Sequence, residues 1–133
     1  METLRGKTRV AVLWIFIAVA MSAHNLFELF GLMKSGGMEE MTEELAIMGP
    51  GMMAFFALFW VIPLWMAFIS LTVEGSANRW VNLILGILFT IFNTWHFIEH
   101  LVPPSPAQIL IIGSTVAATA LIVWYTWKWS KQE

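Results

Sequence analysis

The chain has 133 residues, of which 59% are hydrophobic and 12% are charged, and its mean hydropathy is +0.74. Soluble domains carry about 25% charged residues, so this composition indicates a membrane protein with the lipid bilayer as its main partner. The net charge is only −2, cysteine is absent and there is no basic run, which excludes disulfides, thiolate metal sites and nucleic-acid partners.

Four apolar stretches are long enough to cross a hydrocarbon core of about 30 Å, which takes about 20 helical residues. They cover residues 10–33, 50–72, 80–102 and 107–127. Helices are expected because lipid cannot hydrogen-bond to the backbone N–H and C=O groups, which a helix satisfies internally. Pro63 should kink the second span. The sequence therefore predicts one all-α domain over residues 1–133, an integral membrane up-down four-helix bundle.

The first span contains HNLFELF, residues 24–30, which places a histidine and a carboxylate inside an apolar helix. His24 and Glu28 lie about 40° apart around the helix axis, and about 13 Å and 8 Å from the end of the span near Met33. Ionisable groups within spans usually face the bundle interior and partner one another. These two residues are therefore candidates for one half of a site, and a pair that only locks helix packing is the alternative interpretation.

The segment after the first span combines methionine with glutamate. Two sets of residues recur there at helical spacing: the apolar Met38, Met41, Leu45 and Met48, and the acidic Glu39, Glu40, Glu43 and Glu44. This pattern predicts a short amphipathic helix on the outer membrane surface, whose acidic face would attract cations. Six of the nine methionines lie between residues 33 and 53, so thioether ligation of copper(I) is the alternative interpretation.

The third span ends with WHFIEH, residues 95–100. On a helix, His96 would lie about 9 Å from the end of the span, and Glu99 and His100 about 3–5 Å from it. The three side chains share an arc of about 100°, with Asn93 beside them. Ordinary solvation at the membrane interface is the alternative interpretation of Glu99 and His100.

The distribution of Lys and Arg predicts the orientation. Basic residues precede the first span, occupy the second loop and end the chain: Arg5, Lys7, Arg9, Arg79, Lys128 and Lys131. The first and third loops hold Lys34 alone. Because basic residues stay on the cytoplasmic side, both termini should be cytoplasmic, in a multi-pass protein of the cell (inner) membrane. Assembly into a homo-oligomer is possible as well.

The two polar stripes lie at similar depth, so we expect the first span to pack against the third and the stripes to converge. Imidazole and carboxylate are ligands of zinc, copper and iron. The predicted metal residues are His24, Glu28, His96, Glu99 and His100, with Glu99 accepting an imidazole N–H rather than binding the ion. A single ion is favoured, because the second and fourth spans contain no carboxylate. A haem between His24 and His96 is less favoured, since carboxylates adjoin both.

Three other functions stay open. Glu28 could exchange protons for a cationic substrate, as in the small multidrug exporters, which this chain resembles only in length and helix number. The protein could instead be an intramembrane acid–base enzyme acting on a lipid-like substrate. The His and Glu side chains would then transfer protons in a site with aromatic walls such as Trp95 and Phe97. The last alternative is an accessory subunit of a larger membrane complex.

Three segments carry a family resemblance: FELF at 27–30, NRWVNLILGILFTI at 78–91 and LIVWYTWKW at 121–129. In these the chain resembles a bacterial family of small four-helix integral membrane proteins of unknown function. The resemblance implies a four-helix membrane fold and matches Glu28 to the carboxylate in that family's first helix. The histidines of WHFIEH are not part of the shared pattern, so the resemblance does not support the metal hypothesis.

Overall fold

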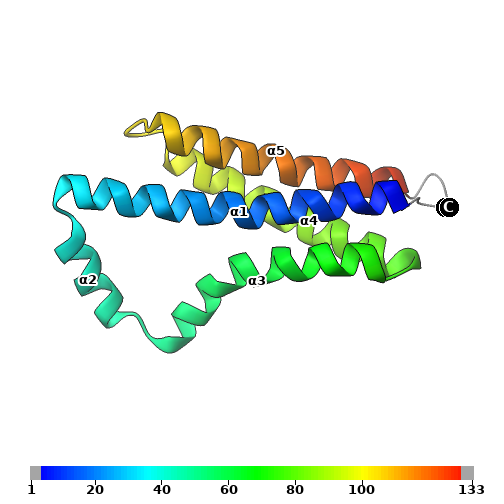
Figure 1. Cartoon of the computed structure of the whole chain (residues 1–133), viewed down its shortest axis with the longest axis horizontal. Helices are drawn as coiled ribbons and strands as arrows, with labels where there is room; N and C mark the ends of the chain where they lie inside the picture. The colour runs from blue at the N-terminus through cyan, green and yellow to red at the C-terminus, as the bar shows by residue number, and fades with distance from the viewer. Residues whose placement is uncertain (1–3, 130–133) are drawn as a thin grey trace.

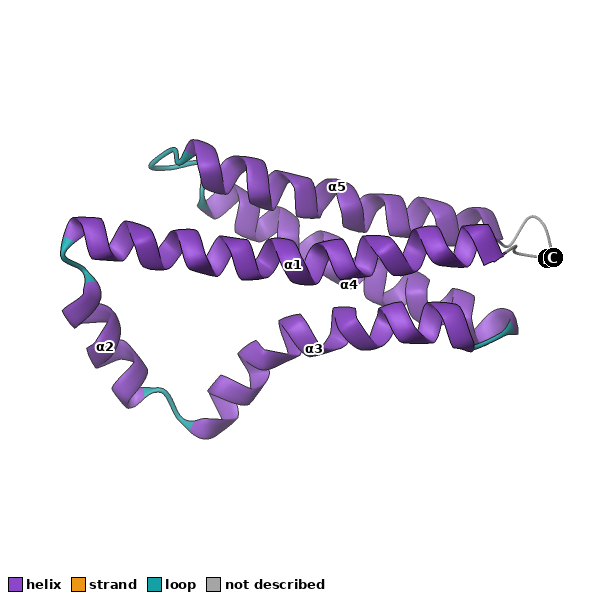
Figure 2. Ribbon diagram, viewed as in Figure 1, coloured by secondary structure: helices purple, strands orange, loops and turns teal. Residues whose placement is uncertain are grey.

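The computed structural model describes residues 4–129, and five helices joined by short loops make up that part of the chain (Figures 1 and 2). They are α1 (Leu4–Ser35), α2 (Met38–Ile47), α3 (Pro50–Thr72), α4 (Gly75–Glu99) and α5 (Pro106–Trp129). All except α2 are long and apolar enough to cross a membrane. The predicted all-α class and the four long apolar helices are therefore confirmed.

The four long helices run alternately in opposite directions (Figure 1). We call the end of the bundle where α1 begins and α5 ends the terminal end, and the opposite end the distal end. In Figure 1, α2 lies off the bundle at the distal end, and none of its residues is buried. The short helix expected from the methionine and glutamate pattern is thus present.

Helix boundaries differ from the predicted spans mainly in α1 and α4. α1 begins at Leu4 rather than residue 10, and α4 covers Gly75–Glu99 rather than 80–102. Hydropathy marks the stretch that suits lipid, whereas backbone hydrogen bonding continues into polar flanking residues. The turn after α4 contains Pro103 and Pro104, which lack the N–H needed to continue a helix.

α5 packs against both α1 and α4, and α1 also packs against α3, whereas α3 and α4 make little contact. The close approach of α4 to α5 depends on Gly86. A Cβ atom at this position would lie 3.1 Å from Val123 Cγ2 and 3.2 Å from Ile122 Cγ2. Small residues at such crossings let helix backbones approach closely where lipid supplies no hydrophobic driving force.

The apolar core fills the terminal half of the bundle around Trp14, which is fully buried and meets Phe89 edge-on with ring centroids 5.4 Å apart. A polar network lies within it. Trp14 Nε1 donates to Asn82 Oδ1 at 2.7 Å, and Ser70 Oγ donates to the same oxygen at 3.0 Å. Asn78 receives a hydrogen bond from Asn82 Nδ2 at 2.6 Å and donates to the Ser70 carbonyl at 3.0 Å. This network joins α1, α3 and α4.

α3 is bent, and its beginning leans away from the other long helices (Figure 1). Pro63 lies inside the helix and is buried. A proline in a helix interior removes one hydrogen bond and clashes with the preceding turn, which accounts for the bend. The expected kink is therefore present, and it tilts the beginning of α3 away from the bundle, while Phe59 still stacks on Phe92 of α4 and Trp60 donates to Ser22 of α1.

Asn82→Ala should lower the free energy of unfolding by about 1–3 kcal/mol, because it leaves the buried Trp14 indole N–H without an acceptor. The measurement is the melting temperature of the detergent-purified protein. Asn25→Ala is the matched control, since Asn25 is exposed and its amide donates only to the Met21 carbonyl of its own helix. Equal melting temperatures for the two variants would contradict a stabilising role of the network.

Candidate metal centre

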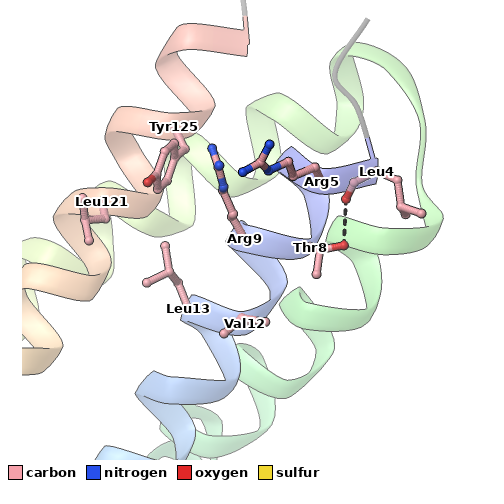
Figure 3. Close-up of a pocket in the computed structure, with 8 residues that line it drawn as sticks. All are labelled: Leu4, Arg5, Thr8, Arg9, Val12, Leu13, Leu121 and Tyr125. Carbon is pink, nitrogen blue, oxygen red and sulfur yellow. Dashed lines mark hydrogen bonds between the residues drawn. The ribbon is translucent and has the colours of Figure 1, made fainter.

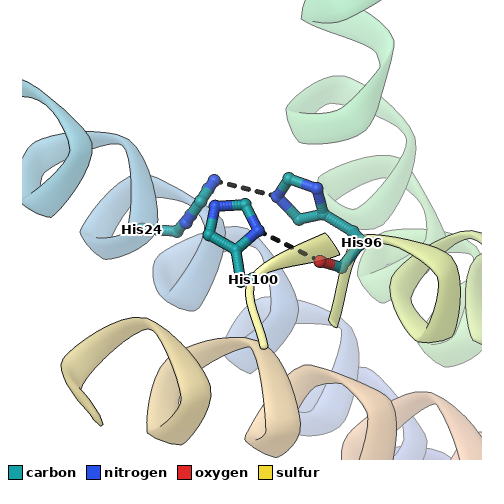
Figure 4. Close-up of side chains that lie close together, drawn as sticks. All are labelled: His24, His96 and His100. Carbon is teal, nitrogen blue, oxygen red and sulfur yellow. Dashed lines mark hydrogen bonds between the residues drawn. The ribbon is translucent and has the colours of Figure 1, made fainter. Parts of the chain in front are cut away.

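Three histidines come together in the distal half of the bundle (Figure 4). His24 comes from α1 and is 5% exposed, whereas His96 and His100 come from the end of α4 and are partly buried. One ring nitrogen from each residue lies within 4.8 Å of the other two, so the three side chains could hold a metal ion. The spacing of four residues puts His96 and His100 on the same side of the chain, one turn apart.

The two predicted stripes do converge. His24 Nε2 lies 2.9 Å from His96 Nε2, and His100 Nε2 lies 3.0 Å from Glu28 Oε1. The first span meets the third through side chains rather than by close backbone packing, because α1 packs most closely on α3 and α5 while α4 packs on α5. α1 and α4 are diagonal neighbours, and their long polar side chains cross the interior to meet.

Gln108, in the first turn of α5, holds the imidazole of His24. Its Oε1 lies 2.8 Å from His24 Nδ1, and its Nε2 donates to the His24 carbonyl at 3.1 Å. The carbonyl can only accept, so the amide nitrogen must face it and the amide oxygen must face the ring. His24 therefore carries its proton on Nδ1, and when the ring is neutral the lone pair of Nε2 points at the other histidines.

Gln108 is 5% exposed, and sequence reasoning missed it. The available signal was a glutamine at the start of an otherwise apolar span, at the same end of the bundle as the histidines. A buried amide in such a place needs an internal partner. That rule could have drawn attention to Gln108, but it could not have identified His24 as the partner.

His100 follows the last residue of α4 and is held on both sides. Its Nδ1 donates to the His96 carbonyl at 3.0 Å, and its Nε2 is paired with Glu28. These two contacts fix the orientation of the His100 ring. Glu28 is thus brought to the edge of the cluster through His100.

Glu99 lies outside the cluster. Its Oε2 is 3.6 Å from His96 Nδ1, beyond hydrogen-bond distance, and its Oε1 accepts a hydrogen bond from Trp95 Nε1 at 2.8 Å. The Glu99 side chain is 55% exposed. A small rotation would bring it to His96, and it faces the ring nitrogen opposite the one that meets His24.

The spacing of the imidazoles suits a common metal ligand set. Two ring nitrogens bound to one zinc or copper ion at about 2.0–2.1 Å lie about 2.9–3.4 Å apart for angles of 90–110° at the metal. The His24 and His96 nitrogens are 2.9 Å apart. Without a metal, the same distance fits one N–H···N hydrogen bond, which His96 Nε2 donates to His24 Nε2.

A cavity of about 360 Å³ adjoins the histidines between α1, α3 and α4. Its lining residues are Met21, His24, Asn25, Phe56, Phe59, Trp60, Phe92, His96 and Glu99. The walls are mainly aromatic, and the rings of Phe59 and Phe92 stack with centroids 4.4 Å apart. The two residues expected in such walls do not line this cavity: Trp95 is 67% exposed, and the Phe97 ring packs against Gly113 of α5.

Comparison of the chain with family models, with curated proteins and with solved structures finds no match. The resemblance to the bacterial four-helix family therefore stays a prediction. The function has to be inferred from the geometry of the site.

The tautomer of His24 can be tested directly, because the chain has only three histidines. In ¹⁵N NMR spectra of histidine-labelled protein, we expect one neutral ring protonated on Nδ1, and Gln108→Leu should convert it to a mixture of tautomers. Ser114→Ala is the control, since its hydroxyl donates only to the Leu110 carbonyl within α5. A His24 ring protonated on Nε2 in the unaltered protein would show that the Gln108 contact is wrongly assigned.

Proposed function

We propose that this chain is a multi-pass membrane protein that binds a single transition metal ion through His24, His96 and His100, with Glu28 as the fourth ligand. The observation that carries the proposal is the approach of three ring nitrogens to within 4.8 Å of one another. To bind the ion, Glu28 would exchange its present contact with His100 Nε2 for a bond to the metal.

Two further features support a metal. The Nδ1 hydrogen bond of His24 to Gln108 is the kind of outer contact that orients a metal-bound imidazole and raises its basicity. Glu99, beside His96 Nδ1, is placed to do the same for His96. Polar imidazoles are costly inside an apolar bundle. A cluster of three, each held in a fixed orientation, therefore favours a set of metal ligands over side chains that only fill space.

The donor atoms favour zinc, copper(II) or iron over copper(I). None of the methionines between residues 33 and 53, whose thioethers would have suited copper(I), lines the cavity beside the histidines, and Met21 is the one thioether in that lining. One ion is favoured over two, because neither α3 nor α5 contains a carboxylate to hold a second. Haem is disfavoured by the 2.9 Å between His24 and His96, since two imidazoles bound to opposite faces of one haem lie about 4 Å apart.

Metal analysis of the purified protein tests the proposal. We expect about one equivalent of zinc, copper or iron and no Soret band, and His96→Ala should reduce the metal content at least tenfold because it removes the central ligand. Glu44→Gln, on the exposed helix α2, is the matched control and should retain the metal. Equal metal content in all three proteins, or a metal-free protein after reconstitution with each ion, would overturn the proposal.

An acid–base enzyme is the second candidate, and the aromatic cavity favours it. That cavity brings His24, His96 and Glu99 to the edge of a space suited to a small lipid-like molecule. The exporter alternative is weaker, because Glu28 does not line the cavity and is paired with His100. A metal-free protein would favour the enzyme.

We also propose that both termini are cytoplasmic and that the histidines lie in the outer leaflet of the inner membrane. The two described ends of the chain, Leu4 and Trp129, lie at the same end of the bundle (Figure 1), and that end carries Arg5, Lys7 and Arg9. Retention of basic residues in the cytoplasm supports this orientation.

Single-cysteine labelling measures the orientation cleanly, because the chain has no natural cysteine. A Thr42→Cys variant in α2 should react with an impermeant maleimide added outside intact cells. A Ser76→Cys variant in the first turn of α4 should react only after the membrane is opened. The reverse pattern would place the termini outside.

A further inference from the structure

A second cavity lies at the terminal end of the bundle, far from the histidines. It has a volume of about 750 Å³ and is framed by the beginning of α1 and the end of α5 (Figure 3). Its lining residues are Leu4, Arg5, Thr8, Arg9, Val12, Leu13, Leu121 and Tyr125. This volume is within the range of about 300–1,000 Å³ typical of ligand sites.

The cavity contains two guanidinium groups that have no carboxylate partner within the described residues 4–129. Figure 3 shows Arg5 and Arg9 on successive turns of α1, with Tyr125 beside Arg9. The Arg9 guanidinium lies 5.9 Å from the centre of the Tyr125 ring. Among residues 4–129, neither arginine forms an ion pair with Asp or Glu. Two like charges in one cavity favour an anion between them, and planar guanidinium groups suit phosphate in particular.

Other cations at this end are engaged elsewhere. Lys7 Nζ donates to the Val73 carbonyl at 3.4 Å, and Arg79 Nε donates to the Thr126 carbonyl at 3.3 Å. Lys128 Nζ lies 3.8 Å from the centre of the Trp124 ring. Arg5 and Arg9 differ from these cations because both guanidinium groups line the cavity, and the ring that Arg9 faces, Tyr125, lines it too.

Toward the terminal end the cavity is lined by Arg5, Thr8 and Arg9 as well as Leu4, and toward the middle of the bundle its lining is apolar. Val12 and Leu13 lie one to two helical turns beyond Arg5 and Arg9, toward the middle of the bundle, and Leu121 faces them from α5. At 1.5 Å per residue, Leu4 and Leu13 are about 14 Å apart along the axis of α1. This order of charged and aliphatic groups matches a phospholipid lying along the helices with its headgroup at the terminal end.

We propose that this cavity binds an anionic phospholipid, with its phosphate paired to Arg5 and Arg9 and its acyl chains along Val12, Leu13 and Leu121. Basic pockets between transmembrane helices recognise such headgroups through the same pairing. A zwitterionic lipid offers less net charge to two guanidinium groups, and free phosphate leaves the aliphatic wall uncovered. The proposal does not depend on the metal site.

Native mass spectrometry of the detergent-purified full chain tests the proposal, with phosphatidylglycerol and phosphatidylcholine added in equal amounts. We expect preferential retention of phosphatidylglycerol. An Arg5→Gln and Arg9→Gln double variant should weaken its binding by about 30-fold, because each basic residue contributes a factor of about five. A Lys34→Gln and Lys128→Gln double variant loses the same charge outside the cavity and should bind normally.

A second variant keeps the test decisive if the loss of two arginines impairs folding. Leu121→Trp places a large ring in the aliphatic part of the cavity while every charge is retained, and it should also reduce binding. Equal retention of both lipids, an equal loss in the lysine control, or complete displacement by millimolar inorganic phosphate would each overturn the proposal. The last result would show an anion site without acyl-chain recognition.

Discussion

A polar side chain inside this bundle has to find its partner inside the bundle, because an apolar interior supplies no water. Two clusters meet this constraint, and both join α1 to α4 across the diagonal of the bundle. Trp14 bonds Asn82 near the terminal end, and His24 meets His96 in the distal half. Among residues 4–129, Asn93 Nδ2 is the one buried side-chain atom left without a partner.

The diagonal contacts differ in how strongly they are supported by packing. Around Trp14 the interior is filled, since Phe89, Met66 and Ile122 surround it and Gly86 lets α4 approach α5. Around His24 a cavity remains between α1, α3 and α4, because the beginning of α3 leans away from the other long helices. The interior is therefore filled around Trp14 and hollow beside the imidazoles.

Charge divides the molecule in the same way. The distal half holds the imidazoles with Glu28 and Glu99 beside them, and the acidic helix α2 lies at that end. Among residues 4–129, five cations lie at the terminal end: Arg5, Lys7, Arg9, Arg79 and Lys128. A cation is thus favoured at one end of the bundle and an anion at the other, which agrees with the chemistry proposed for each cavity.

Much of the candidate site was predictable from local pattern. The helices follow from the length of the apolar stretches, and the grouping of His24 with Glu28 and of His96 with His100 follows from the helical repeat. Their convergence followed from the cost of leaving such groups in an apolar medium. These rules involve residues within a few positions of each other, or a property of a whole span.

The partners that depend on distance along the chain could not be predicted in this way. Gln108 is 84 residues from His24, and only the angle of α5 brings its amide to the ring. The aromatic walls of the cavity come mainly from α3, whose distance from α4 is set by the bend at Pro63. Sequence by itself determined which residues are helical, which are polar within the spans and which share a face, because these depend on local geometry and solvent. Which faces meet, and at what distance, was decided by the tertiary structure, because packing of all four helices together sets their separations.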